Sequence, residues 1–165
     1  MVQQITLMSP DRIERSLKRI ALEVWEHLGE ETSPLIIGLN ERGLATAQVI
    51  ASHVNALTGG NSELCRFDVE KNNFNGERPR IQQRRVLVVD DVIFSGKSMF
   101  SAITNITNQA EVEDLKVAVL VDRGHRKLPV EASYIGIEVP TKLAEHVDVI
   151  VEDNQLKEVI LIEHT

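Results

Sequence analysis

The sequence predicts an α/β fold in which helices flank a central, mainly parallel β-sheet. Short runs of apolar, mostly β-branched residues are typical of strands that are buried on both faces of such a sheet. Strands that alternate with amphipathic helices favour parallel pairing. The strand runs are residues 35–39, 86–89, 115–121 and 134–139, and helical spacing occurs in residues 10–28, 44–57 and from 99 onwards.

Length and composition predict one domain, residues 1–165. Hydrophobic residues make up 42% of the chain and charged residues 26%, as in ordinary globular proteins. The single cysteine, Cys65, excludes an intrachain disulfide and indicates a reducing compartment. Residues 1–8 lack the features of a signal peptide, and no apolar run is long enough to cross a membrane, so we expect a cytoplasmic protein without membrane contact. The formal net charge of −7 opposes indiscriminate binding to nucleic acid.

The first helix has recognisable start and stop signals. Ser9 suits the N-cap, Pro10 suits the first helical position, and Gly29 ends the pattern. Its apolar face predicts packing against the sheet. This face consists of Ile13, Leu17, Ile20, Val24 and Leu28.

Two further strand signals lie outside the central runs. Residues 64–69 alternate between apolar and polar side chains and predict a half-buried strand nearer the sheet edge. Residues 147–151 and 159–162 flank the turn-forming pair Asp153 and Asn154, which predicts a C-terminal β-hairpin.

The stretch from Arg85 to Ser98 is the strongest candidate for a functional site. Its apolar strand is followed by Asp90 and Asp91 and then by the small-residue turn Ser95–Ser98, which opens a helix. Backbone N–H groups in such a turn can converge on a phosphate, aided by the helix dipole. Ionised carboxylates accept hydrogen bonds, so the acidic pair suits sugar hydroxyls or hydrated Mg²⁺. Together these features predict a site for a sugar phosphate at the carboxyl edge of the sheet.

Other interpretations of this stretch are weaker. A Walker A loop would need a glycine where Asp91 stands. A purely structural turn has no reason to keep two adjacent carboxylates that repel each other.

A second strand–loop–helix unit has a similar organisation. The loop Asn40–Gly43 follows the strand at 35–39, with Gly43 allowing close backbone approach and Arg42 supplying a cationic fork. An arginine in such a loop is as often a solvated surface residue, so the residues alone leave both interpretations open.

The sequence VLVVDDVIFSGKS, ending at Ser98, resembles the phosphoribosyl-diphosphate motif of type I phosphoribosyltransferases. The residues from Leu120 to Val130, LVDRGHRKLPV, resemble the pyrimidine-operon attenuation proteins, as do Tyr134–Gly136 and Val139–Thr141. Those members of the family bind RNA and can also make UMP from uracil. The resemblance covers most of the chain and implies the type I phosphoribosyltransferase fold with a small hood.

The resemblance also implies ligands and roles for individual residues. The ligands are 5-phosphoribosyl-1-diphosphate with Mg²⁺ as cofactor, a nucleobase such as uracil, and a second copy of the chain in a homo-oligomer. The catalytic residues would be Asp90, Asp91, Arg42 and Lys71, with the two aspartates meeting the metal mainly through substrate or water. The 5-phosphate loop would be Val92, Phe94, Ser95, Gly96, Lys97 and Ser98; the diphosphate loop Asn40, Glu41, Arg42 and Gly43; and the base pocket Asp122, Arg123, Lys142, Leu143 and Ala144.

One segment departs from the family pattern. Attenuation proteins carry a Tyr-Arg-Asp-Asp element soon after the strand that corresponds to residues 64–69, whereas this chain reads Val69-Glu70-Lys71-Asn72-Asn73 and continues into a short polar loop, residues 70–84. The family places a mobile catalytic loop here, which closes over diphosphate. Two functions therefore stay open: a phosphoribosyltransferase, or an RNA-binding regulator of pyrimidine genes with weak turnover. For the regulator, the basic residues His125, Arg126 and Lys127 would contact leader mRNA.

Overall fold

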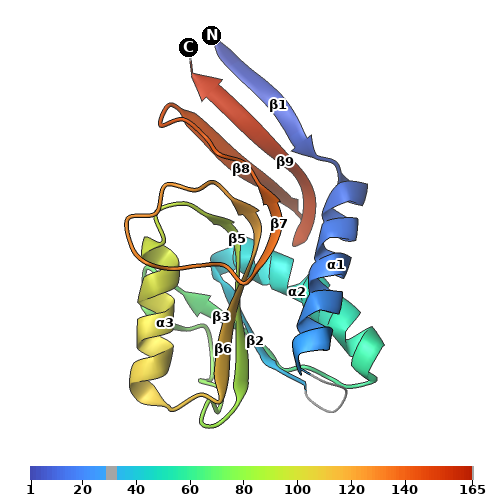
Figure 1. Ribbon diagram of the computed structural model, residues 1–165, viewed down its shortest axis with the longest axis vertical. Coiled ribbons are helices and arrows are strands. Elements are labelled where there is room, and N and C mark those ends of the chain that lie inside the picture. Colours follow the sequence, from blue (N-terminus) through green and yellow to red (C-terminus); the bar gives the residue numbers. More distant parts are fainter. Residues whose placement is uncertain (29–32, 165) are drawn as a thin grey trace.

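The computed structural model describes residues 1–28 and 33–164, which form a six-stranded main sheet and a separate three-stranded sheet (Figure 1). Neighbouring strands of the main sheet are parallel except for the short pair β3–β4. The predicted α/β architecture with a mainly parallel sheet is therefore confirmed. In the spatial order β4-β3-β2-β5-β6-β7, the strands are β4 (Asn73–Phe74), β3 (Leu64–Asp68), β2 (Leu35–Leu39), β5 (Arg85–Ile93), β6 (Asp114–Asp122) and β7 (Tyr134–Glu138).

Helices cover both faces of the main sheet. Helices α1 (Pro10–Leu28) and α2 (Asn40–Thr58) lie on one face, and α3 (Lys97–Gln109) lies on the other (Figure 1). Because side chains of a strand alternate between faces, Ile36 packs with α1 and α2 while Ile37 packs with α3. None of the described helices has the length and apolarity to cross a membrane. Gly29, expected to end the first helix, lies outside the described residues.

Helix α2 begins directly at the end of β2, at Asn40, whereas helical spacing predicted a start near Leu44. This tight junction depends on Gly38, where an added Cβ atom would lie 2.5 Å from the Cα atom of Leu44. The missing side chain lets α2 turn back across the strand from which it emerges. The first turn of α2 therefore stays next to the carboxyl ends of β2 and β5.

The three-stranded sheet has the order β1-β9-β8. It combines the predicted C-terminal hairpin, β8 (Glu145–Glu152) and β9 (Gln155–His164), with an N-terminal strand, β1 (Val2–Met8), that pairs antiparallel with β9. The sheet joins the core on the side of α1 and α2, and it projects from one end of the molecule (Figure 1). Sequence reasoning missed β1 because nearly all of its residues are exposed, so it carries no alternating apolar pattern.

The chain connections change direction between β2 and β5, which are neighbours in the sheet. From β2 the chain passes through α2 to β3 on one side, and from β5 it passes through α3 to β6 on the other. In open α/β sheets such a switch point leaves a crevice outside the carboxyl ends of the two strands, and ligands bind there. The topology thus marks the ends of β2 and β5 as the candidate site.

Candidate functional site

The two adjacent carboxylates lie inside strand β5, which continues to Ile93 beyond the predicted strand end. Pairing with β2 stops at Val89, because β2 turns into α2, whereas pairing with β6 continues from Asp90 to Ile93. Asp90 and Asp91 therefore stand where the neighbouring strand has already ended. The backbone N–H of Asp91 donates to Oδ1 of Asp90 at 2.8 Å. Burial and the charge of Asp91 raise the pKa of Asp90 well above its ordinary value.

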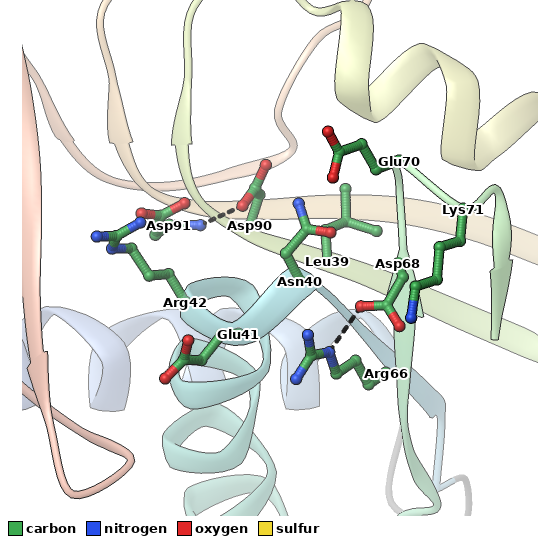
Figure 2. A pocket seen from close by; sticks show the side chains of 10 residues that line it. All are labelled: Leu39, Asn40, Glu41, Arg42, Arg66, Asp68, Glu70, Lys71, Asp90 and Asp91. Carbon is green, nitrogen blue, oxygen red and sulfur yellow. Dashed lines mark hydrogen bonds and ion pairs between the residues drawn. The ribbon is translucent and has the colours of Figure 1, made fainter. Parts of the chain in front are cut away.

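A cavity of about 420 Å³ lies against these carboxylates (Figure 2). It collects polar side chains from the carboxyl ends of β2, β3 and β5, as the topology requires. Six of the residues predicted from the sequence line it: Asn40, Glu41, Arg42, Lys71, Asp90 and Asp91. Four others complete the lining: Leu39, Arg66, Asp68 and Glu70.

The N-terminus of α2 forms one wall of the cavity. No side chain caps its first turn, which leaves backbone N–H groups and the positive end of the helix dipole available to an anion. Asn40 has the left-handed φ of 58°, and its Oδ1 accepts a hydrogen bond from the backbone N–H of Val69 at 3.0 Å. That bond ties the end of β3 to the start of α2, so the two walls of the cavity are held together.

Three cationic side chains line the cavity, and their partners differ. Arg42 donates from Nε to the carbonyl oxygen of Val149 at 3.0 Å, and its Nη2 lies 3.7 Å from Oδ1 of Asp148, so it is attached to β8. Arg66 donates from Nε to Oδ1 of Asp68 at 2.8 Å. Lys71 lies on the turn after β3 and has no ion pair within the described part of the chain.

Sequence reasoning missed three polar lining residues: Arg66, Asp68 and Glu70. The available signal was the position of residues 66–70 at the carboxyl end of a predicted strand. Residues 64–69 are predicted as a half-buried strand nearer the sheet edge, and β3 has this place between β2 and the two-residue β4. The pattern does not show that β3 pairs with β2, which brings its carboxyl end to the cavity.

The predicted 5-phosphate loop has the expected local conformation but does not line the cavity. Gly96 has φ 87° and is buried, and α3 begins at the next residue, Lys97. The carbonyl oxygen of Ser95 accepts hydrogen bonds from the backbone N–H groups of Lys127 and Leu128 at 2.9 and 3.2 Å. The segment after β6 therefore holds the 5-phosphate loop in place through Ser95. Val92, Phe94, Ser95, Gly96, Lys97 and Ser98 are all absent from the cavity lining.

The predicted base-pocket residues also lie outside the cavity. Arg123 is only 6% exposed, and it donates from Nε to Oγ1 of Thr141 at 3.0 Å and from Nη2 to the carbonyl oxygen of Glu145 at 2.7 Å. Its guanidinium carbon lies 4.2 Å from the centre of the Phe94 ring, and burial lowers its pKa. Arg123 thus joins the 5-phosphate loop to the segment between β7 and β8. That segment exposes Lys142, Leu143 and Ala144.

Two members of the predicted basic loop after β6 are engaged within the protein. Both carboxylate oxygens of Asp122 accept hydrogen bonds from Arg126, at 2.9 and 2.8 Å. His125 donates from Nε2 to the carbonyl oxygen of Thr141. Lys127 is exposed, so it is the residue of this loop whose cation faces solvent.

The donor set is compatible with Mg²⁺ that arrives with a substrate. No group of three or more metal-ligating side chains occurs in residues 1–28 and 33–164. Asp90 and Asp91 nevertheless offer hard oxygen ligands, and Mg²⁺ is commonly held by one or two carboxylates together with phosphate oxygens and waters.

The fold and the cavity define an α/β protein that binds ligands at the carboxyl edge of its sheet, with an acidic pair beside an uncapped helix N-terminus. The chain belongs to the phosphoribosyl transferase domain family, whose sequence profile matches residues 7–153. The resemblance identified from the sequence is therefore confirmed.

Among curated relatives, proteins named "Bifunctional protein PyrR" are similar over nearly the whole chain. The protein from Chloroflexus aurantiacus is 31% identical, with 94% of this chain and 93% of the relative covered. The protein from Deinococcus radiodurans is 32% identical, with 94% and 92% covered. These similarities confirm the predicted subfamily.

Solved structures confirm the fold. A hypoxanthine-guanine phosphoribosyltransferase from Bacillus anthracis superposes with a TM-score of 0.78 at 18% identity, covering 99% of this chain and 100% of that chain. The hypoxanthine phosphoribosyltransferase of Trypanosoma cruzi gives a TM-score of 0.76 at 16% identity, covering 94% of each chain. At these identities the likeness concerns the fold alone.

Proposed function

We propose that this protein binds 5-phosphoribosyl-1-diphosphate with Mg²⁺ and transfers the phosphoribosyl group to a nucleobase, with uracil as the preferred base. The observation that carries the proposal is the cavity at the ends of β2, β3 and β5, which combines Asp90 and Asp91 with the uncapped first turn of α2. This combination suits a ligand that has both hydroxyl groups and phosphates. The similarity to proteins named PyrR supports a role in pyrimidine nucleotide metabolism.

The proposed roles combine the residues that line the cavity with the roles that the family resemblance implies for the 5-phosphate loop and the base pocket. Asp90 and Asp91 accept hydrogen bonds from the ribose hydroxyls, and Mg²⁺, when bound, neutralises negative charge on the leaving group. The amides of Asn40, Glu41 and Gly43, together with the charges of Arg42 and Lys71, hold the diphosphate. The 5-phosphate binds at Val92–Ser98. The base lies beside Asp122, Arg123, Lys142, Leu143 and Ala144.

The reaction needs no covalent intermediate with the protein. A ring nitrogen of the base forms a bond to C1 of the ribose, and the bond from C1 to the diphosphate oxygen breaks, so its electron pair leaves with the diphosphate. The ring nitrogen loses its proton to solvent. Because positive charge develops on the sugar and negative charge on the leaving group, catalysis consists of positioning and electrostatic stabilisation.

The charge of the cavity favours binding of the diphosphate as its Mg²⁺ complex. Its lining contains five carboxylates and three cationic side chains. A free diphosphate ester would therefore meet net repulsion, whereas its complex with Mg²⁺ carries less negative charge. We expect donor binding to require the divalent ion.

A second function rests on the bifunctional name of the relatives: an RNA-binding regulator that keeps the ligand site but turns over weakly. The exposed Lys127 would contribute to the phosphate contacts of a leader RNA, and the affinity would fall steeply with salt. Homo-oligomerisation belongs to both functions and can be measured by light scattering.

Two parallel assays separate the two functions. The protein is incubated with the ribosyl diphosphate, Mg²⁺ and, in turn, uracil, hypoxanthine, guanine, adenine or orotate, and diphosphate release is measured. In parallel, leader RNA of pyrimidine genes is titrated at two salt concentrations. Diphosphate release that depends on uracil supports the transferase, and RNA binding without release supports the regulator. Failure of calorimetry to detect binding of the donor with Mg²⁺ would exclude both, since each needs the ligand site.

A further inference from the structure

Besides Lys71, the cavity is lined by two guanidinium groups, and one of them belongs to a residue that the sequence did not single out. Arg42 follows the expected motif, but its guanidinium points to β8, where Nε donates to Val149 and Nη2 faces Asp148. Nε and Nη2 of Arg42 are therefore directed toward the three-stranded sheet, although Arg42 also lines the cavity. A second guanidinium also lines the cavity.

This second guanidinium belongs to Arg66. It lies on β3 and lines the cavity together with Asn40, Glu41 and Arg42 of the first turn of α2 (Figure 2). The one hydrogen bond of its guanidinium within the described residues runs from Nε to Oδ1 of Asp68 at 2.8 Å, so both Nη nitrogens stay available. The Arg66 side chain is 33% exposed, and that of Asp68 is 14% exposed.

The arrangement restricts the guanidinium without using up its donors. Asp68 holds Arg66 through Nε, which restricts the guanidinium and leaves its two Nη atoms without a hydrogen bond in the described residues. A planar guanidinium recognises phosphate oxygens through two parallel N–H donors. The neighbouring first turn of α2 adds uncapped backbone N–H groups to the same wall.

We infer that Arg66 supplies the two-pronged guanidinium contact to the diphosphate of the ribosyl donor, while Arg42 attaches the first turn of α2 to β8. This inference rests on the proposed function, because it assigns a further residue to the same ligand. It makes Arg66 a determinant of affinity for diphosphate groups, and it predicts no role in binding a ligand that lacks them.

The test measures two ligands on the full chain by titration calorimetry: inorganic diphosphate with Mg²⁺, and UMP, which has the 5-phosphate, ribose and base but no diphosphate. Wild type is compared with Arg66→Gln and with Arg66→Lys, which keeps the charge but loses the fork. The matched control is Arg84→Gln. Arg84 is also paired with a carboxylate, Glu63, at 2.7 Å, but it lies outside the cavity.

We expect Arg66→Gln to weaken diphosphate binding about 10- to 100-fold and to leave UMP binding within about twofold of wild type. Arg66→Lys should recover part of the loss, and Arg84→Gln should match wild type with both ligands. Unchanged UMP binding shows that the variant is folded. In the transferase assay, the KM for the ribosyl donor should rise with the same ratio between variants.

Two outcomes would overturn the inference, and they differ in what else they remove. If wild type binds both ligands and Arg66→Gln retains the diphosphate affinity, the assignment of Arg66 is wrong while the proposed function stands. If wild type binds neither ligand, the proposed function fails and the assignment fails with it.

Discussion

A Cβ atom added to Gly43 would lie 2.8 Å from the carbonyl oxygen of Val89. Real Cβ atoms do not approach backbone oxygens this closely, so the first turn of α2 can rest on the end of β5 only because residue 43 has no side chain. The same added atom would lie 3.3 Å from Oδ1 of Asp90. This contact places the N-terminus of α2 beside the acidic pair. The helix N-terminus and the acidic pair are the two halves of the candidate site.

Replacing this glycine should therefore open the site. In Gly43→Ala, α2 must move away from β5 to accommodate the methyl group, which we expect to lower the free energy of unfolding by about 1–3 kcal/mol. Donor affinity should fall at least about tenfold, because the helix amides and the carboxylates no longer meet one ligand. Chemical denaturation and titration with the ribosyl donor measure the two effects. The control Ser52→Ala alters an exposed position of α2 and should change neither quantity. A variant with wild-type affinity would contradict the proposed contact.

Lys71 offers a test of the segment that departs from its family. Because it lines the cavity without an ion pair in the described residues, its charge is free to act on a bound anion. Lys71→Gln should lower kcat/KM for the ribosyl donor about 10- to 100-fold, since a charged hydrogen bond contributes about 1.5–3 kcal/mol. Its melting temperature should equal that of wild type, because the side chain is exposed.

The matched control for this lysine is Lys116→Gln. Lys116 is exposed and lies near the start of β6, at the opposite edge of the sheet. It should leave activity unchanged. Equal activity of Lys71→Gln and Lys116→Gln would show that the turn after β3 does not take part in the reaction.

Local sequence patterns predicted most of the main sheet. Buried parallel strands must be apolar on both faces. For that reason the near-continuous apolar runs at residues 86–89 and 115–121 could be recognised as strands from the sequence. Strand β1 could not be found this way, because it is held by pairing with β9 at the far end of the chain and its residues 2–6 are exposed. Pairing between distant segments leaves little trace in the sequence of either one.

For the site, the sequence predicted what is contiguous. Asp90 and Asp91 follow a clear strand, and Asn40–Gly43 follow another, so each loop could be identified from its own strand, while the family resemblance assigned both to one ligand. The contribution of Arg66 and Asp68 depends on which strand β3 borders, a fact of sheet topology that composition does not carry. The contacts of Arg42 could not be predicted from the sequence either, because its partners on β8 lie more than a hundred residues away along the chain.

The polar contacts of Arg123 predict a large contribution to stability. Its guanidinium joins Thr141 and Glu145 at once, and the ammonium of a lysine cannot span both acceptors in the same geometry. We expect Arg123→Lys to lower the free energy of unfolding by about 1–3 kcal/mol. Amide hydrogen exchange should accelerate in residues 139–145, because the segment loses two of its hydrogen bonds to the chain that follows β6. Arg15→Lys, on the exposed surface of α1, serves as control and should cost little. Equal exchange rates in both variants would show that other contacts hold this segment.

The half-buried acidic pair predicts that activity and stability oppose each other at Asp90. Burial and the charge of Asp91 raise the pKa of Asp90, so the folded state favours the protonated form. The folded protein is therefore stabilised at low pH, where this group is protonated in both states, and it loses that stability as pH rises from the ordinary pKa of a carboxyl group toward the raised one. Asp90→Asn removes this cost and still offers Oδ1 to the N–H of Asp91.

We therefore expect Asp90→Asn to melt at a higher temperature than wild type at pH 7.5 and to show a smaller difference at pH 4, in buffer with a chelator. Transferase activity should fall by several orders of magnitude, since the amide neither stabilises the cationic sugar nor binds Mg²⁺. Thermal unfolding at several pH values and the diphosphate-release assay measure the two effects. Glu77→Gln, which neutralises an exposed carboxylate in residues 70–84, should give a pH profile like that of wild type. A variant less stable than wild type at pH 7.5 would mean that Asp90 is kept for structure, because a carboxylate retained for binding alone is expected to cost stability where it is buried.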